Sequence, residues 1–315
     1  MKTLKNIFPL VFLLLGLSSC LDDEYLTGIN GDSPNIIDFL EQPDASVQEG
    51  EIYPVYIRSV PISSEEEIII PISYSGSNQA PEDIVVDVAI DETMLQDYNM
   101  AYEEHAIEVA IADLGQDPSQ EEIDEATEIA IEDADAHAFT LIPSSLFTMP
   151  NQVTIKKGER HADLVLKVNS EMFDFDYKYG LPLKLSSSQG MVSSNFGDVI
   201  FQVGGKNEWD GIYNYKTSAN TSLVPNRNST TELHTVSARK LRIIPGLLDN
   251  YTNEVYYTIH EDNSITVECP SLGVQEPQDP RSKYDPATKT LQVYWKQGNG
   301  GRTFEETFTF TGQRP

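Results

Sequence analysis

The chain has 315 residues, of which 21 are Lys or Arg and 50 are Asp or Glu, so its formal net charge is −29. Affinity for nucleic acid comes from Lys and Arg side chains that neutralise phosphates, and a chain this acidic cannot supply it. The composition therefore excludes nucleic acid as a partner, and the length allows one to three domains.

The N-terminus has the pattern of a secretory signal. Lys2 and Lys5 precede an apolar run, Ile7 to Leu17, that is too short to span a bilayer. Leu17-Ser18-Ser19-Cys20 then resembles a bacterial lipobox, which predicts a signal peptide over 1–19 and a lipidated Cys20. An ordinary signal peptide that is cut nearby is the alternative interpretation.

The location follows from this anchor. Removal of the signal peptide takes away Lys2 and Lys5 and leaves 19 basic and 50 acidic residues, a formal charge of −31. An anionic membrane surface repels such a chain, so a lipid rather than charge must hold it there. The acidic residues after Cys20 resemble the surface-export signal of Bacteroidetes lipoproteins. We therefore expect lipid anchoring at the outer membrane, on the cell surface, with 20–34 as the lipidated Cys and a polar tether.

Cysteine usage is sparse. With Cys20 taken by the anchor, Cys269 has no partner for an intramolecular disulfide, although the compartment would permit one. Cys269 ends an alternating strand pattern, 264–269, which favours a buried structural thiol over a catalytic nucleophile.

Short β-branched and aromatic runs separated by Gly, Pro, Ser and Asn predict an N-terminal sheet domain over 35–203. The Gly-containing turn 157–160 predicts a hairpin between 152–156 and 161–168. Several short strands without βαβ alternation indicate an antiparallel, immunoglobulin-like β-sandwich.

An acidic helical insertion interrupts these strands at about 93–136. Apolar residues from Met94 to Val109 recur at helical spacing, and Asp117-Pro118 predicts a second helix with Asp117 as its cap. No Lys or Arg occurs between Arg58 and Lys156. A solvated insertion, a calcium site and a contact for a basic partner are the three interpretations, although no EF-hand motif is present.

A second domain is predicted over 207–315, after the Gly204-Gly205-Lys206-Asn207 boundary. At least six strand candidates follow, which fits a small all-β barrel or a second sandwich.

Catalytic motifs are missing from the sequence. The five histidines are scattered, and no zinc motif, serine-hydrolase elbow or cysteine pair appears. Asp174 and Asp176 offer two nearby carboxylates, but we interpret them as part of a turn or strand rim. We therefore predict no enzyme, no metal and no cofactor.

Aromatic residues crowd the second domain and are the candidate glycan-binding residues. Exposed Tyr and Trp rings pack on sugars, and neighbouring polar groups form hydrogen bonds with the sugar hydroxyls. For each ring, packing in the protein core is the alternative interpretation. In the adjacent pairs Tyr256/Tyr257 and Tyr294/Trp295, strand alternation sends one member of each pair out of the core. The candidates are Trp209, Tyr213, Tyr215, Tyr251, Tyr256, Tyr257, Tyr294 and Trp295.

Three segments carry a family resemblance: 141–147, 153–159 with Thr-Ile-x-x-Gly-Glu, and 179–185 with Leu-Pro-Leu-Lys-Leu. They resemble the adhesin-like N-terminal domain of unknown function in Bacteroidetes surface lipoproteins, which also occurs before family-18 glycosidase domains. Residues 207–315, with Trp209-Asp210-Gly211-x-Tyr213, are similar to lipocalin-like C-terminal domains of such proteins. The acid motif of family-18 glycosidases is absent.

The resemblance implies a non-enzymatic surface lipoprotein that binds glycan or assists a glycan-uptake complex in the outer membrane. A structural or adhesive protein-interaction module is the alternative, with the acidic insertion as its contact surface. A glycosidase with an unrecognised site is a third hypothesis.

Overall fold

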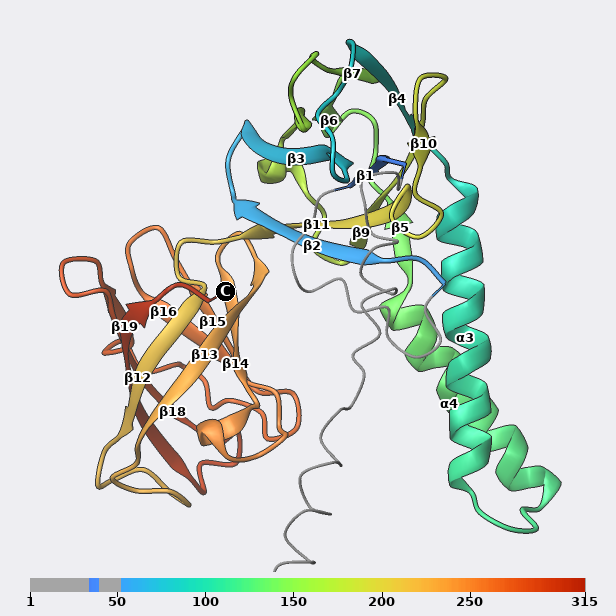
Figure 1. The fold of residues 1–315 in the computed structure, drawn as a ribbon. Helices are drawn as coiled ribbons and strands as arrows, with labels where there is room; N and C mark the ends of the chain where they lie inside the picture. Colours follow the sequence, from blue (N-terminus) through green and yellow to red (C-terminus); the bar gives the residue numbers. More distant parts are fainter. Residues whose placement is uncertain (1–33, 40–51, 315) are drawn as a thin grey trace, which may run out of the picture.

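The computed structural model describes residues 34–39 and 52–314 (Figure 1). The described residues form three sheets and two α-helices, which confirms the predicted all-β class. The predicted signal peptide, Cys20 and the tether up to residue 33 lie outside the described residues. Within the described chain, no helix is long and apolar enough to cross a membrane.

The N-terminal part is a two-sheet sandwich. In spatial order, the first sheet contains β10 (Met191–Val192), β1 (Ile36–Phe39), β3 (Glu66–Ser75), β8 (His161–Val168) and β6 (Phe147–Thr148). The second contains β2 (Val55–Pro61), β11 (Asp198–Lys206), β9 (Lys178–Ser186), β4 (Ile84–Ile90) and β7 (Gln152–Ile155), with β5 (Phe139–Leu141) beside β9. A short 3-10 helix, Ser170–Met172, lies between β8 and β9.

Alternation along the strands builds the sandwich core. In β3, Ile68, Ile70 and Ile72 are buried while Ile69 is exposed, as expected for a strand with one face on the core. Leu183 of β9, in the second sheet, belongs to the same buried cluster. The two sheets therefore share one aliphatic core.

The predicted hairpin between 152–156 and 161–168 is wrong. β7 pairs with β4 in one sheet, whereas β8 pairs with β3 and β6 in the other. The turn around Gly158 therefore crosses between the sheets. Both strands alternate because each buries one face in the shared core, and alternation does not reveal the partner strand.

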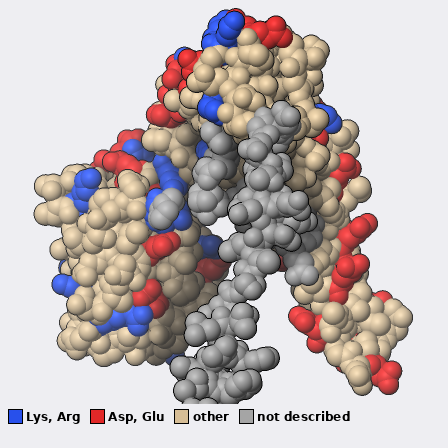
Figure 2. Space-filling view, viewed as in Figure 1, with Lys and Arg blue, Asp and Glu red and all other residues tan. Residues whose placement is uncertain are grey.

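The acidic insertion forms a helical arm, α3 (Thr93–Asp113) and α4 (Gln120–His137). Its base is held to the sandwich by Tyr98 in a small buried cluster and by Asn99, which exchanges two 2.9 Å hydrogen bonds with the backbone of Phe139. Beyond the base the arm projects away from the sheets (Figure 1), and carboxylates follow its length (Figure 2).

The cap predicted for the second helix is wrong. Ser119, not Asp117, caps α4: the Glu122 N–H donates to Ser119 Oγ at 3.3 Å, and the Ser119 N–H donates to the Glu122 carboxylate at 2.8 Å. This is a capping box. Asp117 instead occupies the left-handed region in the preceding loop, with φ at 57°.

The C-terminal part is one curled eight-stranded antiparallel sheet. Its spatial order is β16 (Ile265–Glu268), β15 (Tyr256–Ile259), β14 (Lys240–Ile244), β13 (Asn228–Ser237), β12 (Gly211–Thr217), β19 (Thr303–Gly312), β18 (Thr290–Lys296) and β17 (Lys283–Asp285). A 3-10 helix, Leu247–Asp249, follows β14. An isolated bridge between Ser264 and Lys283 joins the two end strands and nearly closes a barrel. Cys269 is a buried free thiol at the barrel core, as the strand pattern predicts.

Candidate functional site

The predicted aromatic platform is largely barrel core, and this corrects the sequence interpretation. Trp209 precedes the first barrel strand, is 5% exposed and lines the cavity described below. Tyr213, Tyr215, Tyr257 and Trp295 are at most 2% exposed, so their rings are enclosed by protein. They are buried because the inward positions of the barrel strands need large rings to fill the interior.

Three of the predicted aromatics, Tyr251, Tyr256 and Tyr294, are partly exposed, and they come from separate segments. The Tyr256 ring lies 4.8 Å from the Lys240 amine, and its hydroxyl donates to Glu254 at 2.7 Å. The Tyr294 ring lies 4.2 Å from the Arg281 guanidinium. Local cations therefore occupy the rings of Tyr256 and Tyr294.

A carboxyl group at the centre of the barrel was missed by sequence reasoning. Glu306 on β19 accepts hydrogen bonds from Tyr215 Oη at 2.7 Å, Trp295 Nε1 at 2.9 Å and Tyr257 Oη at 3.2 Å. Complete burial raises the pKa of Glu306, and hydrogen bonds from Tyr215, Trp295 and Tyr257 oppose the shift without cancelling it. Glu306 thus satisfies three polar groups that the large rings bring into the core.

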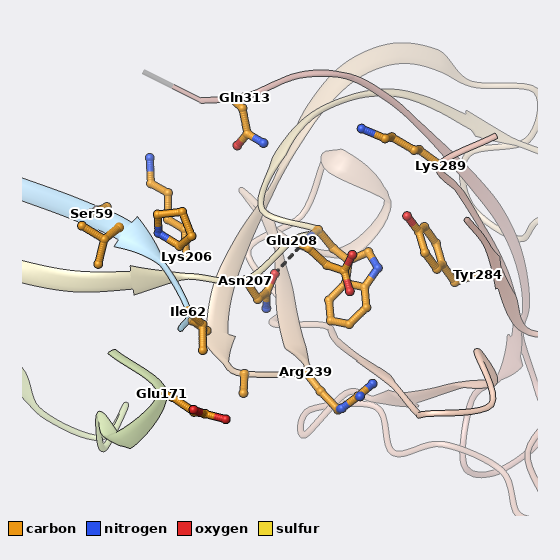
Figure 3. A pocket seen from close by; sticks show the side chains of 14 residues that line it. Ser59, Ile62, Glu171, Lys206, Asn207, Glu208, Arg239, Tyr284, Lys289 and Gln313 are labelled. Carbon is orange, nitrogen blue, oxygen red and sulfur yellow. Dashed lines mark hydrogen bonds between the residues drawn. The ribbon is translucent and has the colours of Figure 1, made fainter. Parts of the chain in front are cut away.

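The candidate binding site is a cavity of about 750 Å³ between the sandwich and the barrel (Figure 3). The sandwich contributes Ser59 to Ile62, Glu171 and Lys206, and the barrel side contributes the rest. The residues lining it from the barrel side are Asn207, Glu208, Trp209, Ala238, Arg239, Tyr284, Lys289 and Gln313.

The segment that joins the two parts builds the floor of this cavity. Asn207 is buried, and its side-chain amide donates to the Ser237 backbone oxygen at 2.9 Å and accepts from the Trp209 N–H at 3.1 Å. Tyr213 Oη donates to the Trp209 backbone oxygen at 2.6 Å. Gly211 is required because a Cβ there would lie 2.5 Å from the Phe310 ring. The Trp209-Asp210-Gly211-x-Tyr213 motif therefore fixes Trp209 in the cavity.

Asp210 connects this motif to Arg314 through an ion pair. Its carboxylate accepts from Arg314 Nε at 2.9 Å and from the Thr235 N–H at 2.7 Å. Burial alone would raise the pKa of Asp210, but the hydrogen bonds from Arg314 and Thr235 outweigh it and lower the pKa. Asp210 is thus charged at neutral pH, and its ion pair with Arg314 holds the joining segment against the barrel.

Two aromatic rings form one wall of the cavity. Trp209 and Tyr284 pack edge to face, with ring centroids 5.8 Å apart and an interplanar angle of 86°. Trp209 is 5% exposed. Burial raises the pKa of Tyr284, and a side-chain hydrogen bond from Trp209 opposes this shift, so the indole N–H faces the Tyr284 hydroxyl. Tyr284, which is partly exposed and lines the cavity, is therefore the ring of this pair that a ligand can reach.

The cavity carries charges of both signs. Lys206, Arg239 and Lys289 are its cations, and Glu171 and Glu208 are its carboxylates. Figure 3 shows Lys289 beside Tyr284 and Lys206 near Ser59 of the sandwich. These groups can donate to and accept from a polar ligand that packs on the aromatic wall.

The residues of this cavity do not form a recognised catalytic set. The cavity carboxylates, Glu171 and Glu208, are both exposed. Across the described ranges, no group of three or more His, Cys, Asp and Glu side chains is placed to hold a metal ion. Asp174 lies in a turn, where its carboxylate accepts from the Asp176 N–H at 3.1 Å, as predicted.

The fold and site define a class: a two-part, all-β protein with a polar and aromatic cavity at the junction of sandwich and barrel. Residues 43–192 match a family model described as a "-like, N-terminal domain". Residues 211–312 match a domain of unknown function, DUF7015. The two matches agree with the resemblance seen in the sequence, an N-terminal domain of this kind followed by a second β domain. No curated protein matches the chain.

Solved structures from Bacteroides species are similar to this chain. A Bacteroides ovatus protein of unknown function aligns with a TM-score of 0.53 at 12% sequence identity, over 90% of this chain and 96% of its own. Another B. ovatus protein of unknown function has a TM-score of 0.49 at 15% identity, over 87% and 93%. An auxiliary nutrient binding protein from Bacteroides thetaiotaomicron has a TM-score of 0.46 at 14% identity, over 85% and 92%.

Proposed function

We propose that this protein is a non-enzymatic binding protein whose ligand is a glycan held in the cavity between the sandwich and the barrel. The observation that carries the proposal is the Trp209–Tyr284 wall, which is flanked by the polar and charged side chains of the cavity. Aromatic rings pack against the apolar faces of sugars, and flanking polar groups take the hydroxyls. A volume of about 750 Å³ is within the usual range for small-ligand sites.

The proposal includes the place of action. A lipid on Cys20 would anchor the protein at the outer membrane, on the cell surface, where it would bind polysaccharide or assist an uptake complex. The support for this part is the Leu17-Ser18-Ser19-Cys20 segment and the acidic residues after it.

Affinity-gel electrophoresis of the full chain against a panel of host and dietary polysaccharides tests the proposal. We expect retardation by at least one polymer, and Trp209→Phe, which keeps a ring but removes the N–H that faces the Tyr284 hydroxyl, should weaken it. Tyr284→Ala should do the same without disturbing the buried Trp209 backbone contacts. Tyr294→Ala is the matched control, because Tyr294 lines a different surface hollow of about 290 Å³. No retardation by any polymer would contradict the proposal.

The acidic arm favours a second candidate, a protein-interaction module. The arm is buried against the sandwich only near its base, at Met94, Leu95 and Tyr98, and it exposes Met100 and Ile129 among its carboxylates. Deleting 104–136 discriminates the two functions. Glycan retardation should survive this deletion, whereas binding to a protein partner should not.

A glycosidase is tested by incubating the purified chain with any polysaccharide that it retains. We expect no release of sugar. Release that is lost in Glu171→Gln or Glu208→Gln would revive the enzymatic hypothesis, because these are the carboxylates that line the cavity.

A further inference from the structure

The charges of the cavity narrow its ligand class, an inference that rests on the proposed glycan function. We propose that the site takes an acidic glycan, one that bears carboxylates or sulfate esters, and that Arg239 and Lys289 each bind one of its anionic groups. The two cations lie apart in the cavity, on either side of Glu208 (Figure 3).

The local charge of the cavity is opposite to that of the chain. The whole protein has a formal charge of −29, whereas three cations and two carboxylates give the cavity lining a formal charge of +1. Salt screens exposed charges beyond about 8 Å at physiological ionic strength, so a bound ligand experiences the lining more than the distant acids of the arm. The acidic residues are concentrated in 1–206, whereas 207–315 carry 11 basic and 13 acidic residues. The cavity therefore lies beside the nearly balanced part of the chain, and its lining presents an anion with a favourable site.

Arg239 has unused capacity to bind an anion. It is exposed in the turn between β13 and β14, and its guanidinium makes one long hydrogen bond, 3.4 Å from Nη1 to the Ile259 backbone oxygen. No ion pair joins it to another described residue. Four other barrel arginines do pair with carboxylates: Arg227, Arg242, Arg281 and Arg314. The guanidinium fork of Arg239 is thus free to bind a carboxylate or sulfate with two parallel hydrogen bonds.

The surroundings of Lys289 also position its amine to bind an anion. Its backbone lies in the left-handed region, with φ at 48°, in the turn between β17 and β18, and its backbone oxygen accepts from the Phe310 N–H at 3.1 Å. Its amine lies 5.0 Å from the centroid of the Phe310 ring. Within the described ranges, this amine has no carboxylate partner. The turn and the ring therefore hold a cation at the cavity beside Tyr284 (Figure 3).

The remaining groups fit the rest of such a sugar. The Trp209–Tyr284 wall supplies the apolar packing surface, and the Tyr284 side chain is its partly exposed member. Glu171 and Glu208 can accept hydrogen bonds from sugar hydroxyls. They would also repel a ligand with many closely spaced anionic groups, so we expect separate anionic groups of the glycan to lie against Arg239 and against Lys289.

Affinity electrophoresis of the full chain with three polymers tests this inference. Polygalacturonate carries carboxylates, chondroitin sulfate carries both carboxylates and sulfate esters, and carboxyl-reduced polygalacturonate is the neutral counterpart of the first. We expect binding to at least one acidic polymer and at least tenfold weaker binding to the neutral counterpart. Arg239→Gln and Lys289→Gln should each weaken acidic binding about tenfold, the usual size of one charge-assisted hydrogen bond. Lys216→Gln, an exposed β12 residue away from the cavity, should leave it unchanged.

The outcomes separate this inference from the proposed function. Equal binding of neutral and acidic polymers that depends on Trp209 would overturn the acidic ligand while leaving glycan binding in place. Acidic binding that is equally strong in Arg239→Gln, Lys289→Gln and Lys216→Gln would also overturn it. Loss of all polymer binding would remove the proposed function itself.

Discussion

The sandwich and the barrel fill their interiors with different side chains. The sandwich core is mainly Ile, Val and Leu, as at Ile70, Leu164 and Leu183. The barrel core contains stacked and tilted rings, such as Trp295 on Phe304 with centroids 4.1 Å apart and Tyr215 on Phe308 at 4.8 Å. Two sheets that face each other at about 10 Å are filled mainly by aliphatic residues, with a few rings such as Phe39 on Phe201, whereas an eight-stranded barrel has a wider interior.

This difference has a polar consequence. Tyr and Trp rings carry hydroxyl and indole groups into the barrel, and each such group needs a partner when it is buried. Glu306 supplies acceptors for Tyr215, Tyr257 and Trp295. The barrel interior is therefore occupied by rings and their acceptor, and the ligand site that we propose lies outside it, at the junction with the sandwich.

The largest effect is expected from Phe308→Ala. The Phe308 ring contacts Tyr215 and Tyr257 with centroids 4.8 and 5.2 Å away, so its loss leaves a cavity and should lower the free energy of unfolding by about 3–5 kcal/mol. Leu183→Ala in the sandwich should cost about 2–5 kcal/mol. Urea unfolding followed by tryptophan fluorescence, which reports on Trp209 and Trp295, should show the Phe308 effect directly. Leu223→Ala, at an exposed site, is the control, and an equal effect there would contradict the assigned core.

Glu306→Ala should rank next, because it leaves three buried donors without an acceptor. Each unsatisfied group costs about 1–3 kcal/mol, and partial relaxation should limit the total to about 3 kcal/mol. Glu306→Gln keeps the shape and one acceptor oxygen, and it should lose less. A larger loss in Glu306→Gln than in Glu306→Ala would contradict the hydrogen-bond account.

The same residue predicts a pH dependence. Because burial raises its pKa above the ordinary 4.5, the folded state holds the Glu306 proton at pH values where the unfolded state has released it. The contribution of Glu306 to stability is therefore full below pH 4.5 and is lost as the pH rises through the folded pKa. The difference in unfolding free energy between the wild type and Glu306→Gln should shrink or reverse over that rise. A difference that is independent of pH would contradict the raised pKa.

Local patterns in the sequence were enough for the fold class but not for strand partners. Alternation identified β7 and β8 as strands, yet their pairing depended on which sheet each one joined, and no local pattern carries that information. Alternation also sorted the pairs Tyr256/Tyr257 and Tyr294/Trp295, each with one buried member.

The candidate site was only partly visible in the sequence. Trp209 appeared in a motif and among the aromatic residues, but its role as a cavity wall depends on Tyr284, which is 75 positions away in the chain. Arg239 and Lys289 lie in separate turns, and no periodicity or motif marks them as neighbours. Glu306 is one of 50 acidic residues, so its burial could not be singled out without the barrel.

A smaller effect is expected at the segment that joins the two parts. Asp210→Asn keeps the shape but removes the charge that pairs with Arg314, and it should cost about 1–3 kcal/mol. Because the pKa of Asp210 is lowered from 3.8, this contribution is present above pH 3.8 and is lost as the pH falls through the lower, folded pKa. Urea unfolding at neutral and acidic pH should show the cost of Asp210→Asn only near neutrality. Arg314→Ala in a double-mutant cycle should show coupling with Asp210, and additive effects would contradict the ion pair.

The smallest effect should come from the acidic arm, which lies outside both cores. Ser119→Ala removes the hydroxyl that accepts from the Glu122 N–H and should destabilise α4 by about 1 kcal/mol. Hydrogen exchange at the first turn of α4 should speed up, because the arm is buried only near its base and can open locally. The unfolding transitions of the sandwich and the barrel should stay unchanged, with Ser77→Ala, in an exposed sandwich loop, as the matched control. A shift in either transition would mean that the arm is coupled to the cores, and that deleting 104–136 cannot serve as a clean test of partner binding.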